Sequence, residues 1–384
     1  MSIPILSFFT GAGFLDLGMD KAGFDIVWRN EYHQPFVDGF RYGFSKLYDT
    51  QPDEFKVSTD SITDLTPYKI RHEAFSGKNW PDVFGVIGGP PCPDFSVAGK
   101  NLGKEGDNGK LTGVYFDQIL GLMPSFFIFE NVKGILSNRK NRAYLVEQLH
   151  KISAQYVFDI KLMNSLDVGA PQDRERVFIV GLHKSYLSDI ADKETILEFE
   201  QLNSYLRSIG LQPKKIEKYN WFDWPYLEKF DNAKDKYSWP TTSPFGSDPI
   251  LPDYLPLELC VQNCLENLAG IENQNEHFTP KSNKFTIVKE GDVSRKSFKR
   301  LHRWRYSPTA AYGNNEVHLH PYLPRRISVR EAMRIQTVPD KFALPKEMTL
   351  SNKFKTIGNG VPVKLAQEIG NSLFSLFSTE NFCY

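Results

Sequence analysis

The sequence predicts an α/β fold, and two observations carry this prediction. Short apolar runs alternate with amphipathic segments through about the first 184 residues, which is the rhythm of a sheet covered by helices. Each early run ends in a turn-rich or polar cluster, and open α/β sheets place their ligands at the carboxyl ends of parallel strands. The predicted strands are 3–9, 25–28, 82–87, 126–129, 156–162 and 177–182.

The length of the chain and a change in its composition and periodicity predict two domains. The chain has 384 residues, of which 41% are apolar and 14% aromatic, so it can bury a substantial core. Between about 185 and 325 the periodicity is weak and lysine, tryptophan and proline are frequent. Two helices are predicted after this region, over 329–335 and 362–377. We therefore expect one domain from 1–184 and 340–384, and a smaller one from 185–339.

Charge and cysteine content limit the classes of protein to consider. Lysine plus arginine equals aspartate plus glutamate at 46 each, so any phosphate-binding surface must be local. Four cysteines are too few for a disulfide framework, which predicts a reducing cytoplasm. The apolar run 3–9 is far shorter than the roughly 20 residues that cross a bilayer, so no membrane insertion is expected.

A glycine pair follows the first predicted strand. Gly11 and Gly13 precede an amphipathic run, which reads as strand, tight turn and helix. Glu31 lies twenty residues after Gly11, where an acidic side chain can bind both hydroxyls of a ribose. Phe14 replaces the third glycine of the dinucleotide fingerprint, which favours an adenosine cofactor without pyrophosphate. An α/β loop without a ligand, or a dinucleotide site, is the alternative.

Cys92 lies in the loop Gly88-Gly89-Pro90-Pro91-Cys92-Pro93, directly after a predicted buried strand. Prolines fix the backbone of this loop and glycines let a ligand approach it. A buried, unreactive thiol is the commoner role of a cysteine, but a proline-clamped loop suits a held nucleophile better. Cys260 and Cys264 lie in an apolar, helix-like run without histidines nearby, so we expect core positions and no metal site.

An acidic residue follows one further predicted strand, and two arginines precede another. Glu130 follows the run 126–129, so its carboxyl should have a raised pKa and could donate a proton. Arg174 and Arg176 precede the run 177–182, and strand alternation would place them on one face, towards a carbonyl oxygen or phosphates. A helix-capping or salt-bridged glutamate and a solvated strand end are the alternatives.

A basic and aromatic stretch lies at 295–306, with the sequence RKSFKRLHRWRY. Cations interleaved with aromatic rings are suited to phosphates and base edges. The alternative is a solvated charged face.

In this order, the motifs resemble the DNA cytosine-5 methyltransferase family over most of the chain except its middle third. The matching segments are Phe9–Gly13, Pro91-Cys92, Glu130–Val132, Gln172–Arg176, Arg326–Ala332 with Gln336, and Gly358–Pro362. The resemblance implies a Rossmann-like sheet that binds S-adenosyl-L-methionine, with helices on both faces and a smaller, irregular target-recognition domain.

The resemblance also implies a reaction. A cytosine is flipped out of the duplex, and Cys92 attacks its carbon 6. Glu130 holds and protonates the ring nitrogen at position 3, and Arg176 holds the 2-carbonyl oxygen. Carbon 5 then takes the methyl group, which leaves S-adenosyl-L-homocysteine. Arg174 would support the loop or contact phosphate.

Further site residues follow from the same resemblance. Those implied for the cofactor are Phe9, Thr10, Gly11, Ala12, Gly13, Phe14, Leu15, Glu31, Tyr32, Asp60, Ser61, Ile62, Pro91, Val114, Asn359 and Val361. Those implied for DNA are Pro93, Ser96, Arg303, Arg305 and Thr309. The sequence departs from the family at Pro93, where glutamine is usual, and at Phe14, where glycine is common.

The resemblance predicts an enzyme that acts on double-stranded DNA as a monomer in a bacterial or phage-encoded restriction-modification system. A separate, cognate restriction endonuclease would be its functional partner. An RNA cytosine methyltransferase of the same architecture is the nearest alternative, and the large middle domain argues for DNA. A non-catalytic binding module is the second alternative, against which Cys92, Glu130 and Arg176 all argue.

Overall fold

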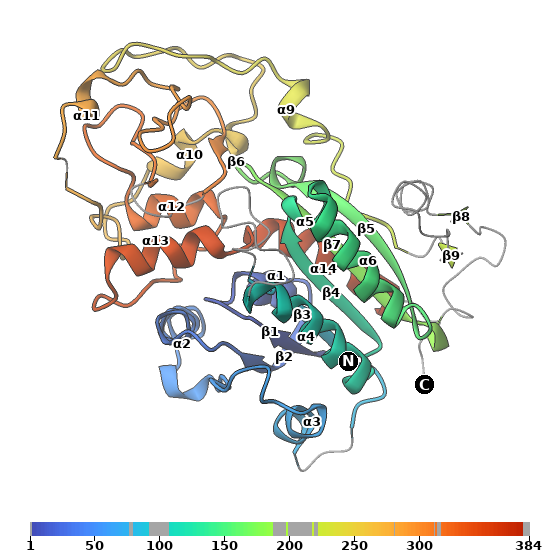
Figure 1. Ribbon diagram of the computed structural model, residues 1–384. Coiled ribbons are helices and arrows are strands. Elements are labelled where there is room, and N and C mark those ends of the chain that lie inside the picture. The colour runs from blue at the N-terminus through green and yellow to red at the C-terminus, as the bar shows by residue number, and fades with distance from the viewer. Residues whose placement is uncertain are drawn as a thin grey trace.

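A six-stranded mixed sheet forms the centre of the larger lobe of the computed structural model (Figure 1). The structure describes residues 2–76, 80–91, 107–186, 197–198, 217–218, 222–279, 281–310, 312 and 316–378. In spatial order the strands are β2 (Phe24–Asn30), β1 (Ile3–Phe8), β3 (Gly85–Gly88), β4 (Phe126–Val132), β7 (Glu175–His183) and β5 (Tyr156–Asn164). All six predicted strands are confirmed.

Strand direction is the feature that the apolar runs did not predict. β1, β2, β3 and β4 are parallel to one another, whereas β7 runs antiparallel to both β4 and β5. The start of β7 therefore lies beside the end of β4, where Val132 is paired with Arg176. This reversal brings the arginine pair to the edge of the sheet at which Glu130 emerges.

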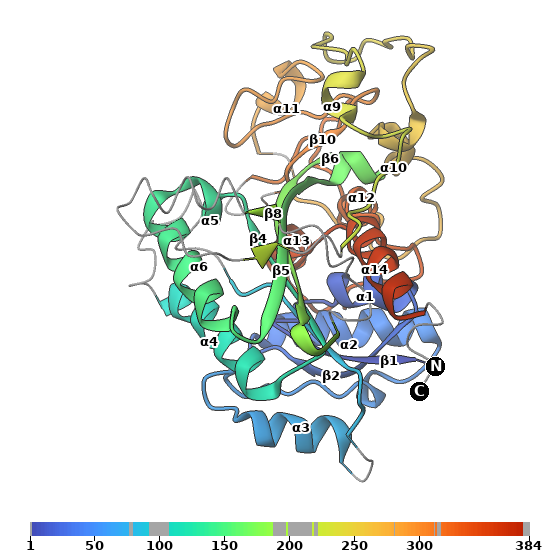
Figure 2. The ribbon, with the colours of Figure 1, turned by 90° about the vertical axis from the view of Figure 1, so that its right-hand side faces the viewer.

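Helices cover both faces of the sheet, as expected (Figure 2). One face packs against α1 (Phe14–Lys21) and α14 (Val363–Ser378), through a cluster that includes Leu15, Ile128 and Leu365. The other packs against α3 (Pro67–Phe75), α4 (Asp107–Leu122) and α6 (Arg139–Ile152), through a second cluster. The remaining elements of this part of the chain are α2 (Gln34–Tyr48), α5 (Gly134–Ser137), η1 (Pro52–Glu54), η3 (Ser165–Val168), η4 (Lys184–Tyr186), β8 (Leu197–Glu198) and β9 (Glu217–Lys218).

A second lobe with little regular structure lies beside the carboxyl end of β4 (Figure 1). Its elements are α9 (Ala233–Lys236), η5 (Leu257–Leu259), α10 (Gln262–Leu265), α11 (Lys284–Ile287) and β10 (Ser307–Pro308), followed by α12 (Val329–Ile335) and α13 (Leu350–Asn359). β10 pairs with β6 (Gln172–Asp173). The predicted helices at 329–335 and 362–377 are confirmed as α12 and α14.

A large apolar cluster joins the two lobes. It contains Phe40 and Phe44 from α2 together with Ile327, Met333 and Phe354 from the later part of the chain. The expected domain limits at 184 and 340 stay a prediction. Cys260 and Cys264 are buried free thiols, which confirms their core position. Within the described ranges, no helix is both long enough and apolar enough to cross a membrane.

Candidate active site

The loop after β1 has an unusual backbone. Phe9, Gly11 and Gly13 have φ angles of 56°, 59° and 79°, a region that favours glycine. A Cβ atom on Gly13 would lie 2.6 Å from the rings of Phe40 and Phe44, so this position has no room for a side chain. Because the non-glycine residue Phe9 adopts the same region, the loop carries local strain of the kind found at binding sites.

Glu31 ties the end of β2 to this loop. Its Oε2 accepts a hydrogen bond from the backbone N–H of Gly11 at 2.9 Å, and its Oε1 accepts one from His33 at 2.8 Å. Burial raises the pKa of the Glu31 carboxyl, although these hydrogen bonds act in the opposite direction. The ring of the next residue, Tyr32, is 74% exposed, so an acid and an aromatic surface adjoin the glycine loop.

The segment 60–62 reaches the same edge of the sheet through Asn30. The side-chain amide of Asn30 donates to the backbone carbonyls of Ser58 and Asp60 at 3.0 and 2.9 Å. The carboxylate of Asp60 forms an exposed ion pair with Lys69, and Ser61 bonds to the hydroxyl of Thr63. The side chain of Ile62 is buried in the apolar cluster beneath, so only its backbone lies at this edge.

Several residues expected at the cofactor have buried side chains. Phe14 packs edge-on against Phe342 with 5.6 Å between ring centroids, and Leu15 lies in the cluster under α14. The side chains of Ala12 and Val361 are also buried, whereas Val114 is half-buried. Asn359 is exposed at the end of α13. The side chains of Phe14 and Leu15 therefore shape the site from behind.

Glu130 and Arg176 form a nearly buried ion pair at the edge between β4 and β7. Glu130 Oε1 lies 3.0 Å from Arg176 Nε, and each side chain is 12% exposed. Burial raises the pKa of the Glu130 carboxyl, although the guanidiniums of Arg176 and Arg174 oppose this effect. The acid and the guanidinium thus form a direct ion pair, which is the alternative that the sequence left open for Glu130, and its role as a proton donor stays a prediction.

The chain that leads to Cys92 passes directly over this pair. A Cβ atom on Gly89 would lie 2.7 Å from Glu130 Oε2, so only glycine leaves space for the carboxylate. The side-chain amide of Asn131 contacts the carbonyl of Pro90 at 3.5 Å. The sequence did not predict the contacts of Gly89 and Asn131 with the opposite segment, because contacts across 41 residues leave no local pattern. Pro91 is the last described residue before Cys92, and Cys92, Pro93 and Ser96 lie outside the described residues.

Arg174 does not share the environment of Arg176, and the phosphate contact considered for it is contradicted. Its side chain is fully buried, and it donates to the carbonyls of Gly358 and Gly360 at 2.9 Å each and of Ala310 at 3.4 Å. Burial lowers the pKa of its guanidinium well below the ordinary value. The alternative role, support of a loop, agrees with these contacts.

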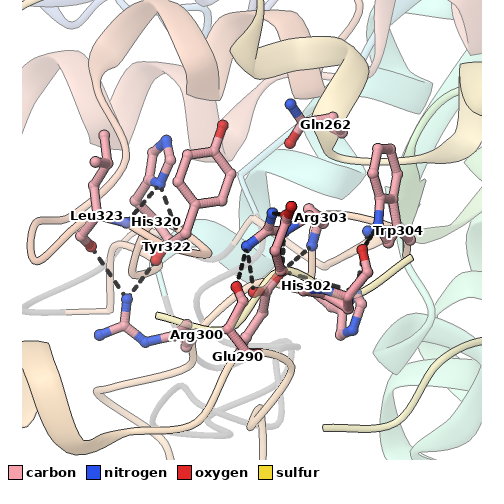
Figure 3. Close-up of polar contacts among 12 residues, drawn as sticks. Gln262, Glu290, Arg300, His302, Arg303, Trp304, His320, Tyr322 and Leu323 are labelled. Carbon is pink, nitrogen blue, oxygen red and sulfur yellow. Dashed lines mark hydrogen bonds and ion pairs between the residues drawn. The ribbon is translucent and has the colours of Figure 1, made fainter. Parts of the chain in front are cut away.

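The basic stretch 295–306 is divided by the fold, and the expectation that Arg303 contacts DNA is wrong. Arg303 is 8% exposed and forms a double ion pair with the fully buried Glu290 (Figure 3). It also bonds to Asp248 at 2.5 Å and to the carbonyl of Ser247 at 2.9 Å. Because these four contacts occupy the guanidinium inside the lobe, it holds the segment 247–248 in place.

The neighbours of Arg303 have similar internal contacts. Trp304 donates to the carbonyl of Pro249 at 2.6 Å, and Arg305 lies 3.5 Å from the carbonyl of Pro240. Thr309 donates to the carbonyl of Asp173 at 2.7 Å. Arg305 and Thr309 are only partly buried, so a DNA contact at either stays a prediction. The exposed cations of the stretch are Arg295 and Lys296.

Comparison with known proteins agrees with this site. Residues 3–375 match the model of the C-5 cytosine-specific DNA methylase family. The chain is 45% identical over 385 residues to the type II methyltransferase M.NmeDI of Neisseria meningitidis serogroup C, covering 97% of this chain and 83% of the relative. It is 32% identical over 387 residues to M.MthTI of Methanothermobacter thermautotrophicus, covering 97% of each.

Solved structures show the same fold at low sequence identity. The methyltransferase EhMeth of Entamoeba histolytica aligns with a TM-score of 0.59 at 12% identity, covering 98% of each chain. DNMT2 of Spodoptera frugiperda aligns with a TM-score of 0.56 at 15% identity, covering 98% of this chain and all of the other. From the match over residues 3–375 and the two type II relatives, the chain belongs to the C-5 cytosine-specific DNA methylase family and is a methyltransferase.

Proposed function

We propose that the chain methylates carbon 5 of a cytosine within a specific sequence of double-stranded DNA, with Cys92 as the nucleophile. The observation that carries this proposal is the Glu130–Arg176 ion pair at the edge of the sheet, 3.0 Å between Oε1 and Nε, beneath the chain that leads to Cys92. An acid and a guanidinium side by side match the ring nitrogen at position 3 and the 2-carbonyl oxygen of cytosine.

The reaction requires a proton on the ring nitrogen while the thiolate of Cys92 attacks carbon 6. Burial raises the pKa of Glu130, which keeps a larger protonated fraction near neutral pH and suits it to donate this proton. Addition of the thiolate makes carbon 5 nucleophilic. After the methyl group is bound there, loss of the proton from carbon 5 expels the thiolate and restores the ring.

The cofactor we propose is S-adenosyl-L-methionine, which supplies the electrophilic methyl group when it is bound. The residues fit this molecule: Glu31 is a half-buried carboxylate for the ribose hydroxyls, and the next residue, Tyr32, is exposed and offers a ring for the adenine. The strained loop from Phe9 to Gly13 presents backbone rather than side chains, which permits close approach. Asn359 would close the site from the end of α13.

Double-stranded DNA is the proposed partner, with its target base flipped out because carbon 5 cannot be reached within the stack. The second lobe would read the sequence, and the exposed Arg295 and Lys296 are the cations of the basic stretch best placed for phosphates. The type II names of the relatives support a role in restriction-modification, beside a separate endonuclease, in the cytoplasm of a bacterium or of a phage host. We propose a monomer.

A mechanism-based trap tests the proposal without knowledge of the recognition sequence. A duplex in which 5-fluorocytosine replaces every cytosine offers each possible site a base whose carbon 5 cannot lose a proton. With S-adenosyl-L-methionine, the wild-type protein should form a complex that survives denaturation, and Cys92→Ser should form none. Absence of the complex with folded wild-type protein would contradict nucleophilic attack by Cys92. The same trap made on RNA would separate the RNA alternative.

A further inference from the structure

The turn between α13 and α14 is held from beneath by buried polar side chains that the reaction does not use. The turn runs from Gly358 to Gly360: Gly358 and the exposed Asn359 end α13, and Gly360 caps it. The last carbonyls of a helix have no partner within the helix, so they need donors from elsewhere. Glycine adds little rigidity of its own, so contacts from other elements help to fix this conformation.

Gln336, at the end of α12, supplies one group of these contacts. Its side chain is fully buried, and its amide nitrogen donates to the carbonyl of Ile357 at 2.7 Å and lies 3.5 Å from the carbonyl of Gly360. Its backbone carbonyl accepts the N–H of Val363 at 3.0 Å, in the first turn of α14. Gln336 thus contacts the chain before, within and after the turn.

Gln172, on β6, bonds to the side chain of Gln336 and so connects it to the segment that contains Arg174. Its amide nitrogen donates to Gln336 Oε1 at 3.2 Å, and its own oxygen accepts the backbone N–H of Ala310 at 3.1 Å. Gln172 is also fully buried, and it stands two residues before Arg174, which holds the carbonyls of Gly358 and Gly360. Gln336, Gln172 and Arg174 therefore join the turn to β6 and to the residue that precedes β7, the strand that carries Arg176.

The buried hydrogen bonds of Gln336, Gln172 and Arg174 restrict the conformation of the turn. A buried amide that loses its partner costs about 1–3 kcal/mol, so these side chains are restricted to one arrangement. That arrangement fixes the carbonyls of Ile357, Gly358 and Gly360, while Asn359, which lies among them in the chain, is exposed.

We propose that Gln336 is a positioning residue for cofactor binding, which acts through the Gly358–Gly360 turn to place Asn359. The inference rests on the proposed function, because it assumes that Asn359 contacts the cofactor. Gln336 itself touches neither cofactor nor base. Its removal should weaken cofactor binding and raise the KM for S-adenosyl-L-methionine, while kcat at saturating cofactor stays within about two-fold of wild type.

A double-mutant cycle tests this role. S-adenosyl-L-homocysteine is titrated into wild type, Gln336→Met, Asn359→Ala and the double variant by calorimetry. We expect each single variant to raise the Kd about ten-fold and the double variant to raise it by little more, since both changes disable the same contact. A double variant with the product of the two effects, about a hundred-fold, would overturn the proposal, as would an unchanged Kd in Gln336→Met.

The control is Asn273, another buried amide, whose side chain bonds to Glu276 and Leu344 and not to the turn. Asn273 bonds to both the carbonyl and the N–H of Leu344, at 3.0 and 2.9 Å. Asn273→Leu should lower the melting temperature and leave the Kd for S-adenosyl-L-homocysteine unchanged. A raised Kd in this control would assign the effect of Gln336→Met to general destabilisation. If wild type does not bind S-adenosyl-L-homocysteine at all, the proposed function fails instead.

Discussion

Glu130 with Arg176 in the larger lobe and Glu290 with Arg303 in the second lobe are two of the glutamate–arginine pairs of the described residues, and their surroundings differ. Glu130 and Arg176 are 3.0 Å apart at the sheet edge, with each side chain 12% exposed. Glu290 and Arg303 are also 3.0 Å apart, but Glu290 is fully buried. Glu290 accepts from the backbone N–H of Arg303 and from two of its guanidinium nitrogens, whereas Glu130 Oε2 points over the Cα of Gly89.

The difference separates a pair that can react from a pair that holds the fold. The carboxylate of Glu290 has its hydrogen bonds completed within the lobe, and its partner also binds the segment 247–248. Glu130 is paired with Arg176 at the edge of the sheet, next to Gly89, and burial raises the pKa of its carboxyl, which suits it to exchange a proton. The proximity of opposite charges does not by itself mark an active site; the position of the pair, inside the second lobe or at the sheet edge next to the chain that leads to Cys92, distinguishes the two.

The largest expected effect is on catalysis at Glu130. Glu130→Gln keeps the shape of the side chain but removes the proton donor, so the rate of methyl transfer should fall about 10²–10⁴-fold. Thermal unfolding measured in parallel should show a folded protein. Retention of more than a tenth of the wild-type kcat would contradict the role of Glu130 as proton donor.

The matched change in the other pair should reduce stability rather than chemistry. Glu290→Gln leaves Arg303 with an incomplete set of acceptors in a buried site, at a cost of at least about 2 kcal/mol in the free energy of unfolding. Urea denaturation measures this loss. Turnover per folded molecule, with cofactor and DNA saturating, should stay within a few-fold of wild type; a loss as large as that of Glu130→Gln would remove the distinction between the pairs.

Gly89→Ala tests whether the space above Glu130 matters. The added Cβ atom would lie 2.7 Å from Glu130 Oε2, so the carboxylate must move. We expect kcat to fall by about ten-fold, because small displacements of a catalytic group are costly. An unchanged kcat in Gly89→Ala would show that the carboxylate tolerates displacement.

Exposed and buried cations of the basic stretch should differ in their contribution to DNA binding. Arg295→Ala with Lys296→Ala should reduce the slope of log K against log salt by up to about two, if both contact phosphates. The salt dependence of DNA binding, measured by fluorescence anisotropy, gives this slope. An unchanged slope would place the phosphate contacts elsewhere on the second lobe.

The smallest effect concerns the pH dependence of stability. The pKa of Glu130 is raised above its ordinary value of 4.5 in the folded state, so its contribution to stability is present below the unfolded pKa and is lost as pH rises through the folded pKa. Glu130→Gln cannot ionise. The free energy of unfolding of the variant minus that of wild type should therefore increase from pH 5 to pH 8, and a decrease over this range would contradict the raised pKa.

Much of the fold and part of the site could be predicted because their signals are local. Apolar runs located all six strands of the main sheet, and helical spacing located α12 and α14. Motif residues at strand ends located Glu31 and Glu130, since parallel strands bring their carboxyl ends together. The direction of β7 was not predicted, because an apolar run has no polarity.

The remaining features depend on contacts between distant segments. A sequence of cations and aromatic residues is the same whether the cations bind phosphates or a buried acid. No sequence pattern indicated that Glu290, thirteen residues before Arg303, would pair with it. The burial of Arg174 depends on carbonyls 136 to 186 residues away. Gln172 and Gln336 were part of recognised motifs, but their contact across 164 residues has no periodicity that could reveal it.

The most direct test of the central claim is the methylation state of DNA from cells that express this chain. A host without cytosine-5 methylation is transformed with the wild-type gene or with Cys92→Ser, and its genomic DNA is analysed by bisulfite sequencing. We predict that one short sequence has a protected cytosine at nearly every occurrence in the wild-type strain and at none in the Cys92→Ser strain. Unprotected DNA in cells that contain folded wild-type protein, or protection that persists in Cys92→Ser, would contradict the account.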